Sequence, residues 1–352
     1  MTYDIAVIGL GPAGSTFCSC IDKHFSVIAI DKKNNSEGSF KKPCGGLLAP
    51  DAQKILAHMQ LNLPKDILVD PQIFSVRTIC LDSDITRHYR RMYVNVDRHK
   101  FDMWLIDNIP SNVTVKQSST VTNIIFDGEI YRITYQSGGQ ESTVKAKMLI
   151  GADGAKSAVR HLLYPGLKLR SYIAIQQWFE ENNPKPFYSC VFDSKNTDCC
   201  SWSISKDGKF IFGGAYPVDN SRQRFENQKT LLRDHGFVFS EPLKTEACIV
   251  LRPKTPFDIV AGKNNAFLIG EAAGLISPSS LEGMSYAMQS AYYLSQALNK
   301  SEKNAADIYA RMLSKLKFKV FTKLAKCPFM YNKHLRAAVM KSGLQSIKMY
   351  KK

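Results

Sequence analysis

The 352-residue sequence lacks the features that mark a secreted, membrane-spanning or metal-binding protein. Its nine cysteines include no CxxC pair and no Cys/His cluster at zinc spacing, so neither a disulfide framework nor a metal site is predicted. No apolar run approaches the length that spans a bilayer. Nothing at the N-terminus resembles a secretory signal, because a buried strand is expected from Tyr3. These absences predict a cytoplasmic protein with reduced thiols.

Acidic residues are absent from the last part of the chain, Ile308 to Lys352, and the whole chain has a formal net charge of +16. The basic residues of this segment are Arg311, Lys315, Lys317, Lys319, Lys323, Lys326, Lys333, Arg336, Lys341, Lys348, Lys351 and Lys352. Apolar residues at helix-compatible spacing lie between them: Leu313, Leu316, Phe318, Phe321 and Leu324. Segment 301–352 is therefore predicted to be a basic helical segment.

Two interpretations of this basic segment stay open. It is either an amphipathic helix that holds the protein at the inner face of an anionic membrane, or a helix whose apolar side packs on its own protein. No nucleic-acid motif accompanies the charge, so nucleic acid is not an expected partner. The sequence carries no signal for an oligomeric state.

The clearest positive feature is the stretch Met1 to Gly14, MTYDIAVIGLGPAG. Tyr3 to Ile8 has the composition of a strand buried on both faces. Gly9, Gly11 and Gly14 follow at GxGxxG spacing. In a dinucleotide-binding βαβ unit these three glycines make a tight turn, let backbone approach a pyrophosphate and let the next helix pack on the sheet.

The residues that follow complete this βαβ pattern. A helix is expected from Ser15 to about His24, and a second strand, Phe25 to Ile30, ends at the acidic residue Asp31. A carboxylate at this place accepts hydrogen bonds from ribose hydroxyls. The alternative, a tight turn without a ligand, leaves Asp31 unexplained. The pattern therefore predicts a bound dinucleotide.

Further motifs point to the same ligand. Lys42 to Leu48, KPCGGLL, places two glycines beside Cys44, where backbone would come close to something flat such as a flavin ring. Arg98 begins a predicted helix and is either a phosphate ligand or a surface arginine. Asp153 stands at the carboxyl end of a strand, Met148 to Ile150, where open α/β sheets bind their ligands.

The middle of the chain has a different pattern. Short strands predominate from Ser171 to Leu251, and Asp207-Gly208 between two of them is a strong hairpin signal. The first pattern returns with a strand at Ala266 to Ile269 and a helix from about Ser285 to Leu298. We therefore predict a discontinuous nucleotide-binding domain at 1–71, 97–170 and 256–300. It is interrupted by an antiparallel domain at 72–96 and 171–255.

These motifs resemble those of the geranylgeranyl reductase family of flavoproteins, within the para-hydroxybenzoate hydroxylase-like group of FAD-dependent oxidoreductases. The resemblance covers roughly Met1 to Leu298 and rests on GLGPAG with Asp31, the helix that starts at Arg98, GADGAKSAVR and GEAAG. It implies an α/β fold: a Rossmann-like FAD-binding domain with a glutathione reductase-type βαβ unit, interrupted by an antiparallel-sheet substrate domain. KPCGGLL resembles the reductases more than the hydroxylases.

The resemblance also implies roles for individual residues. For FAD binding these are Gly9, Gly11, Ala13 and Gly14 at the pyrophosphate, Asp31 at the adenosine ribose, Val121 at the adenine, Arg98 at the ribityl-phosphate region, Asp153 and Gly154 on the far side of the dinucleotide, Gly270 and Glu271 at the ribityl chain, and Gly283 and Met284 at the flavin pyrimidine. Cys44, Gly45 and Gly46 would line the flavin face where substrate arrives. Trp202 and Lys206 match the motif of the substrate cavity.

The chain departs from the family pattern at two FAD positions. Family members usually have glutamate where this chain has Asp31 and aspartate where it has Glu271. The resemblance implies a reductase of carbon–carbon double bonds in an isoprenoid or other apolar substrate, such as a prenyl lipid. NAD(P)H or another donor would supply the electrons. A monooxygenase of the same fold and a non-catalytic, membrane-associated flavin-binding protein are the alternatives.

Overall fold

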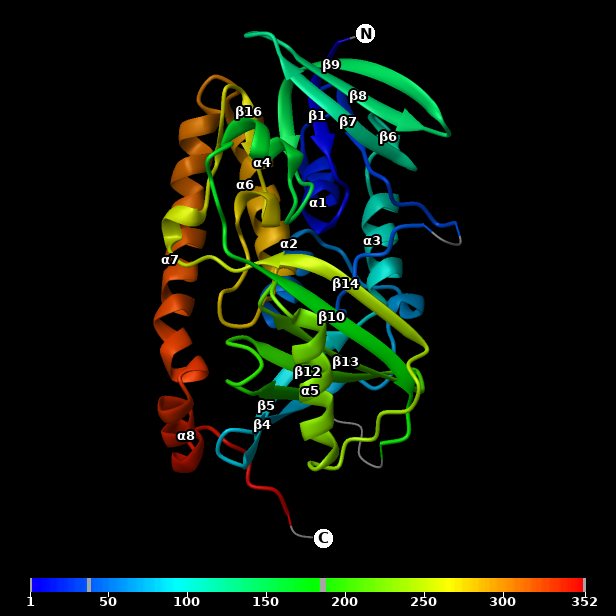
Figure 1. The fold of residues 1–352 in the computed structure, drawn as a ribbon. Coiled ribbons are helices and arrows are strands. Elements are labelled where there is room, and N and C mark those ends of the chain that lie inside the picture. The colour runs from blue at the N-terminus through cyan, green and yellow to red at the C-terminus, as the bar shows by residue number, and fades with distance from the viewer. Residues whose placement is uncertain (1, 37–38, 184–187, 351–352) are drawn as a thin grey trace.

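The structure is a computed structural model that describes residues 2–36, 39–183 and 188–350. Within these residues the strands form two eight-stranded sheets, which lie one above the other in Figure 1. The N-terminus lies at the upper sheet and the C-terminus below the lower one. Two segments named above fall partly outside these residues: Met1 to Gly14, because Met1 is not described, and the basic segment 301–352, because Lys351 and Lys352 are not described.

The upper sheet has a parallel centre, as the N-terminal βαβ pattern predicts. Its order is β16-β9-β1-β2-β6, made of Ala266–Leu268, Gln140–Gly151, Thr2–Ile8, Val27–Ile30 and Val113–Lys116. The antiparallel strands β7 (Ser119–Phe126), β8 (Tyr131–Ser137) and β15 (Gly262–Lys263) extend it. β1 and β2 are central and apolar, so they are buried on both faces.

The lower sheet is mostly antiparallel, and among its described strands β11 and β4 alone pair in parallel. Its order is β14-β10-β13-β12-β11-β4-β5-β3, made of Lys244–Leu251, Ser171–Glu180, Lys209–Tyr216, Cys200–Lys206, Ser189–Phe192, Ile73–Cys80, Ile85–Asn95 and Leu47–Leu48. Asp207 and Gly208 both have positive φ angles, 48° and 75°, at the turn between β12 and β13. The predicted hairpin is confirmed.

Helices cover the sheets and join them. They are α1 (Pro12–Cys20), α2 (Pro50–His58), α3 (Arg98–Asp107), α4 (Ala158–Leu163), α5 (Ser221–Arg233), α6 (Met284–Lys300), α7 (Ala305–Tyr331) and α8 (Lys333–Ser342), with the 3₁₀ turns η1 (Lys65–Ile67), η2 (Pro256–Asp258) and η3 (Gly270–Ala273). α1 packs against α3 and α6. α5 interrupts a stretch expected to hold only strands, and its buried Phe225 and Leu232 pack on the lower sheet.

The helix after Gly11 starts earlier than predicted. Pro12 occupies its first position, where a proline needs no N–H partner and its fixed φ suits the helix. The helix also ends earlier, at Cys20 instead of His24. The strand predicted at Met148 to Ile150 is the last part of the longer strand β9.

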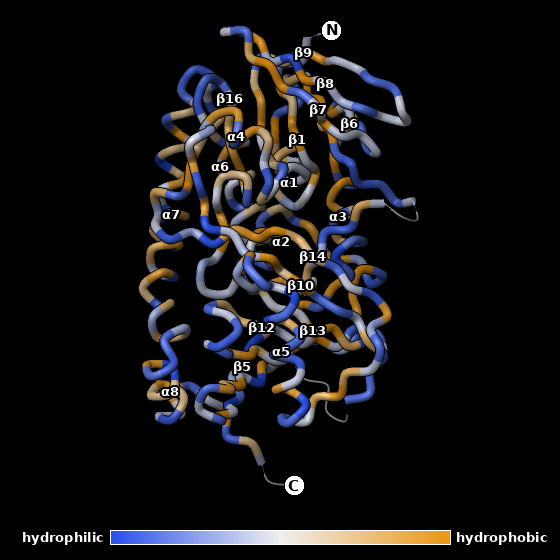
Figure 2. The backbone as a smooth tube through the Cα atoms, in the orientation of Figure 1, coloured by the Kyte–Doolittle hydropathy of each residue, from blue (hydrophilic) through white to orange (hydrophobic). Residues whose placement is uncertain are grey.

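The C-terminal helix α7 runs alongside both sheets (Figure 1). Hydrophobic and hydrophilic residues alternate along this helix, as the colour of the backbone in Figure 2 shows. Tyr309, Leu313 and Leu316 are buried, so one side of α7 packs on its own protein. The other side leaves Phe318 and Phe321 exposed, at 67% and 54%. Within the part of the chain that the structure describes, no helix is long and apolar enough to cross a bilayer.

Candidate functional site

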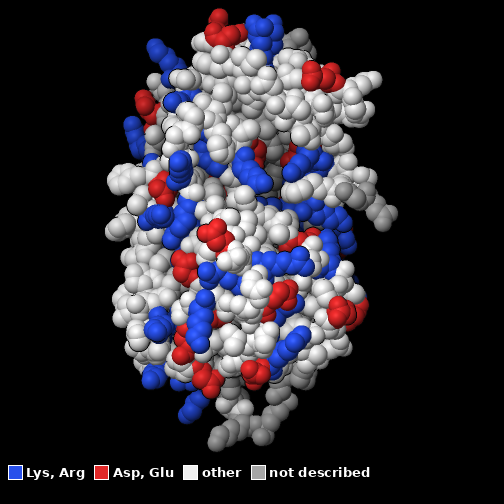
Figure 3. Space-filling model, viewed as in Figure 1, with Lys and Arg blue, Asp and Glu red and all other residues white. Residues whose placement is uncertain are grey.

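A cavity of about 1140 Å³ lies between the carboxyl ends of the parallel strands and the lower sheet. The space-filling view shows a hollow there with basic side chains at its rim (Figure 3). Most of the predicted site residues line it: Gly9, Gly11, Ala13, Asp31, Cys44, Gly45, Gly46, Arg98, Val121, Asp153, Gly154, Trp202, Glu271, Gly283 and Met284. Gly14, Gly270 and Lys206 are not part of the lining. This is the edge where open α/β sheets bind their ligands.

The glycine turn at the start of α1 forms one wall of the cavity. Gly9 has a φ of +96°, and its N–H donates to the carbonyl of Ile30 at 2.9 Å. A Cβ added to Gly14 would lie only 1.8 Å from the carbonyl oxygen of Gly9. The absence of a side chain at Gly14 therefore lets α1 pack directly against the backbone of the glycine turn. A Cβ on Gly11 would meet nothing within 4 Å. The turn is therefore packed on its inner side and open toward the cavity.

Asp31 connects the glycine turn to the end of β2. One carboxylate oxygen accepts from the N–H of Leu10, and the other accepts from the N–H of Lys33 at 2.6 Å. The side chain is buried from solvent but lines the cavity. Asp31 therefore holds the glycine turn through both carboxylate oxygens, and its contact with a ribose stays a prediction.

Asp102 holds two cations near the site. Its carboxylate accepts from Arg98 Nε at 2.8 Å and from Lys33 Nζ at 3.0 Å. Burial alone would raise the pKa of this carboxyl, but Arg98 and Lys33 lower it below its ordinary value. Asp102 is therefore ionised and keeps Arg98 oriented along the wall of the cavity. The sequence analysis did not assign this role, although the i, i+4 spacing on a helix is a signal for it.

Asp153 lies on the opposite wall with Gly154, whose φ is +76°. Its Oδ2 accepts from the N–H groups of Ala158 and Val159 at 2.7 and 3.3 Å, which begin α4. Its Oδ1 is buried and has no hydrogen-bond partner among the described residues. Burial raises the pKa of this carboxyl. An acceptor that the protein leaves unsatisfied at a cavity wall is a place for a ligand donor.

Glu271 bridges the two halves of the site. Its Oε1 accepts from the N–H of Leu251 in β14 at 2.9 Å, and its Oε2 lies 3.7 Å from Lys42 Nζ. The extra methylene relative to aspartate thus serves a contact with the lower sheet. Burial opposes the charge of Lys42, but Glu271 raises the pKa of this ammonium. Gly270, the residue before Glu271, packs against α1: a Cβ on Gly270 would lie 3.0 Å from the Cβ of Ala13.

The start of α6 presents backbone donors to the cavity. Gly283 is the N-cap and Met284 the first helical residue, so their N–H groups lack acceptors within the helix. Glu282 accepts from the N–H and Oγ of Ser285 at 2.7 and 2.6 Å, which satisfies the next donor. The unsatisfied donors suit a carbonyl oxygen of a flavin pyrimidine.

The loop Cys44-Gly45-Gly46 lies against the lower sheet. A Cβ on Gly45 would come within 2.6 Å of Ile204 Cδ1, and one on Gly46 within 2.4 Å of the carbonyl oxygen of Val96. Gly46, which also has a φ of +64°, is therefore required for the loop to lie this close to the sheet, whereas a Cβ on Gly45 would only need the end of the Ile204 side chain to shift. The thiol of Cys44 lies beside the guanidinium of Arg98 and lines the cavity.

The two residues of the predicted substrate motif have different surroundings. Trp202 lines the cavity, and its Nε1 is buried without a partner among the described residues. Lys206 does not reach the cavity, because its Nζ donates to Asn95 Oδ1 at 2.6 Å and to the carbonyl of Val96 at 2.7 Å. Burial lowers the pKa of Lys206 to about 8. Lys206 thus joins β12 to the end of β5, and its contact with a substrate stays a prediction.

Sequence comparison assigns the chain to a family. It is 47% identical over 351 residues to Protein CbrA of Escherichia coli O9:H4 (strain HS), a match that covers 99% of this chain and 96% of that protein. The chain belongs to the CbrA family. CbrA of Shigella sonnei is also 47% identical, with 99% of each chain covered. Residues 77–235 match the family described as FAD binding domain.

Solved structures show the same fold at low identity. A geranylgeranyl bacteriochlorophyll reductase-like protein from Thermoplasma acidophilum has a TM-score of 0.74 at 21% identity, with 99% of this chain and 88% of that chain covered. PqsL of Pseudomonas aeruginosa, a probable FAD-dependent monooxygenase, has a TM-score of 0.70 at 14% identity, with 97% and 100% covered. The predicted fold class is confirmed: this chain has the fold of these FAD-dependent proteins.

The residues at the cavity fit FAD. The turn is open at Gly11, where a pyrophosphate would approach, and Asp153 Oδ1 is an unsatisfied acceptor on the opposite wall. Free helix N–H groups lie at Gly283 and Met284. The roles of the individual residues stay predictions.

Proposed function

We propose that this CbrA family protein is an FAD-dependent reductase of carbon–carbon double bonds in an isoprenoid or other apolar substrate. FAD bound at this cavity, once reduced by NAD(P)H or another two-electron donor, would supply a hydride from N5 to one carbon of the double bond, and water or a nearby acid would supply a proton to the other carbon. The chain itself positions the substrate and excludes water.

The observation that carries this proposal is the set of apolar side chains that the lower sheet and the C-terminal helices add to the lining of the cavity. They include Val76, Ile175, Phe192, Ile204, Val250, Met330, Val339 and Met340, with the polar Arg91, Gln176, Lys323, Lys326 and Arg336 beside them. No histidine is part of the described lining. Its carboxylates, Asp31, Asp102, Asp153, Glu271 and Glu282, all make hydrogen bonds or ion pairs within the protein. Such a wall favours a substrate held by shape, with the reaction supplied by the cofactor.

The first test uses the purified protein. We expect a yellow protein that releases FAD on denaturation and that, after anaerobic reduction, is reoxidised by a prenyl alcohol with formation of the saturated product. Mass spectrometry of the product and the flavin absorbance follow this reaction. Substrate-stimulated oxygen uptake that matches NAD(P)H oxidation would instead indicate a monooxygenase. A reduced flavin that no prenyl acceptor reoxidises would indicate a non-catalytic flavin-binding protein.

We also propose that the exposed side of α7 contacts an anionic membrane. Phe318, Phe321 and Phe329 lie on this side at spacings of three and eight residues and are all more than half exposed. Basic residues surround them, and the described part of the segment after Ile308 contains no acid. Phe329 and Lys326 also line the cavity, so the cavity reaches the surface where these side chains gather. An apolar substrate could then pass directly from lipid into the cavity.

Two point substitutions test the membrane proposal better than removal of the segment, which would uncover the buried Leu313 and Leu316. We expect the double variant Phe318→Ser/Phe321→Ser to bind phosphatidylglycerol vesicles at least about tenfold more weakly than the parent protein. The reason is that each phenylalanine side chain that enters the lipid contributes about 1.5–3 kcal/mol to binding. Phe74→Ser, at an equally exposed position of β4, is the matched control. Sedimentation with vesicles measures binding. Equal binding by the parent protein, the double variant and Phe74→Ser would contradict the proposal.

A further inference from the structure

A second, smaller cavity of about 320 Å³ lies next to the main one. It is bounded by the start of α2, by β5, by the loop before α6 and by α7. Five residues line both cavities: Arg91, Tyr93, Ser280, Glu282 and Lys323. We call the smaller cavity the side chamber. The shared wall makes it an extension of the main cavity.

The charged groups of the side chamber do not balance. Lys319 pairs with Asp51 at 2.6 Å, and Glu282 uses both carboxylate oxygens on Ser285. Arg91 makes one polar contact, from Nη1 to the carbonyl of the neighbouring Arg90 at 2.8 Å. Among the described residues, neither Arg91 nor Lys323 has a carboxylate within ion-pair distance.

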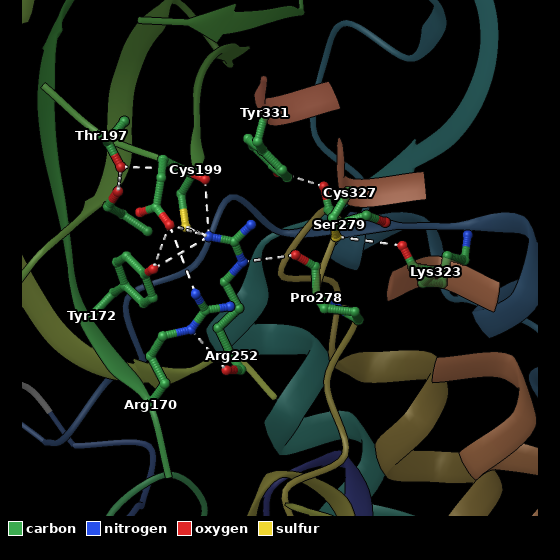
Figure 4. A network of polar contacts seen from close by, with 12 residues as sticks. Arg170, Tyr172, Thr197, Cys199, Arg252, Pro278, Ser279, Lys323, Cys327 and Tyr331 are labelled. Atoms are coloured by element: carbon green, nitrogen blue, oxygen red, sulfur yellow. Dashed lines mark hydrogen bonds and ion pairs between the residues drawn. The ribbon is translucent and has the colours of Figure 1, made fainter. Parts of the chain in front are cut away.

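Lys323 shows this imbalance most directly. In Figure 4 its backbone carbonyl oxygen accepts from the thiol of Cys327 at 3.4 Å, so this contact does not use the ammonium group. The described residues offer this ammonium no hydrogen-bond acceptor. Burial and then the neighbouring Lys326 and Lys319 lower the pKa of Lys323, and they outweigh Asp51 and Glu282, which raise it. The two carboxylates therefore compensate this half-buried ammonium only in part, and an anion would stabilise it further.

A buried hydroxyl provides an independent observation. Tyr286 in α6 is 1% exposed and lines the side chamber, and its hydroxyl has no hydrogen-bond partner among the described residues. Burial, together with Glu282 and Asp51, raises the pKa of this phenol, so the hydroxyl stays protonated. It is a donor that lacks an acceptor, and leaving such a group unsatisfied is costly.

We propose that the side chamber binds a phosphate or carboxylate group through Arg91, Lys323 and the hydroxyl of Tyr286. The anionic group belongs to the polar end of the substrate, whose apolar part extends into the main cavity toward the flavin. This inference rests on the proposed function for the site of the reaction, and it specifies the substrate as an amphipathic anion. Arginine offers paired donors to such a group, and lysine a single charge.

The test compares farnesyl monophosphate, farnesol and inorganic phosphate as ligands of the FAD-loaded protein, with binding measured by isothermal titration calorimetry. We expect Lys323→Met and Tyr286→Phe to weaken farnesyl monophosphate binding by about 10- to 100-fold each and to leave farnesol binding unchanged. Tyr286→Phe removes a hydroxyl that has no partner in the protein, so thermal stability should be unaffected. Lys323→Arg should restore most of the affinity. Lys315→Met, at an exposed lysine of the same helix, is the matched control.

The outcomes separate the possible sources of the anion. Inorganic phosphate that competes with farnesyl monophosphate would assign the site to free phosphate as well as to lipid head groups, and lack of competition would assign it to the head group alone. Affinities of Lys323→Met and Tyr286→Phe equal to that of Lys315→Met would overturn the proposal, as would a parent protein that binds neither phosphate compound. If Lys323→Met and Tyr286→Phe lose affinity for farnesyl monophosphate but the parent protein reduces no double bond, the anion site in the side chamber is supported and the proposed reaction is contradicted.

Discussion

A Gly11→Val variant is expected to fold normally and to bind FAD at least about 100-fold more weakly than the parent protein. Gly11 has a φ of −71° and a ψ of −172°, an extended conformation that valine adopts readily. A Cβ there meets no protein atom within 4 Å, so the new side chain points into open space. That space is where a pyrophosphate would approach the backbone, and each lost hydrogen bond to a charged group costs about 1.5–3 kcal/mol.

Gly14→Ala is the contrasting variant. Its Cβ would lie 1.8 Å from the carbonyl oxygen of Gly9, so the turn and α1 must separate. We expect a clear fall in Tm for Gly14→Ala and none for Gly11→Val. Differential scanning fluorimetry without added FAD measures stability, and quenching of FAD fluorescence measures affinity. Undiminished FAD affinity in a folded Gly11→Val protein would show that the ligand does not approach this turn.

An Arg252→Met variant is expected to lose about 2–4 kcal/mol of unfolding free energy and to bind FAD more weakly. Arg252 is 3% exposed, and its guanidinium donates to the carbonyls of Pro278 and Asp198 at 2.9 Å each (Figure 4). It also contacts the hydroxyl of Tyr172 at 3.2 Å and stacks 4.5 Å from the ring centre of Tyr331. Its loss would leave several buried acceptors without donors, each costing about 1–3 kcal/mol.

The FAD effect follows from the loop that Arg252 holds. Pro278 and Ser279 precede the start of α6 at Gly283, and Tyr331 of α7 donates to the carbonyl of Ser279 at 2.6 Å. Arg252 thus ties the lower sheet and α7 to the segment expected at the flavin pyrimidine. A looser loop would place the Gly283 and Met284 N–H groups less accurately, which reduces affinity.

Arg170→Met is the matched control for Arg252→Met. Arg170 approaches the same Asp198 at 3.8 Å, but its side chain is 29% exposed and the contact is therefore weak. We expect a loss of no more than about 1 kcal/mol. Urea unfolding followed by circular dichroism and by flavin absorbance measures both variants. Equal losses for the two substitutions would show that the carbonyl contacts of Arg252 do not stabilise the junction.

The sequence by itself determined the features that depend on local spacing. The three glycines after Ile8, the acid at Asp31 and the Asp207-Gly208 hairpin each follow from backbone conformations that few residue types adopt, so their positions could be read from the order of residues. The alternation of buried strands and helices likewise identified the α/β unit and its interruption.

Only the tertiary structure decided which side chains meet across the chain. Lys206 stands in a plausible motif, yet its ammonium lies among acceptors at the end of β5 and not at the cavity. The apolar residues of α7 divide between a buried and an exposed side according to what packs beside them. Arg91, Tyr286 and Lys323 come together from three distant elements. Local spacing limits the conformation of the backbone, but the partner of a side chain depends on how the sheets and helices pack.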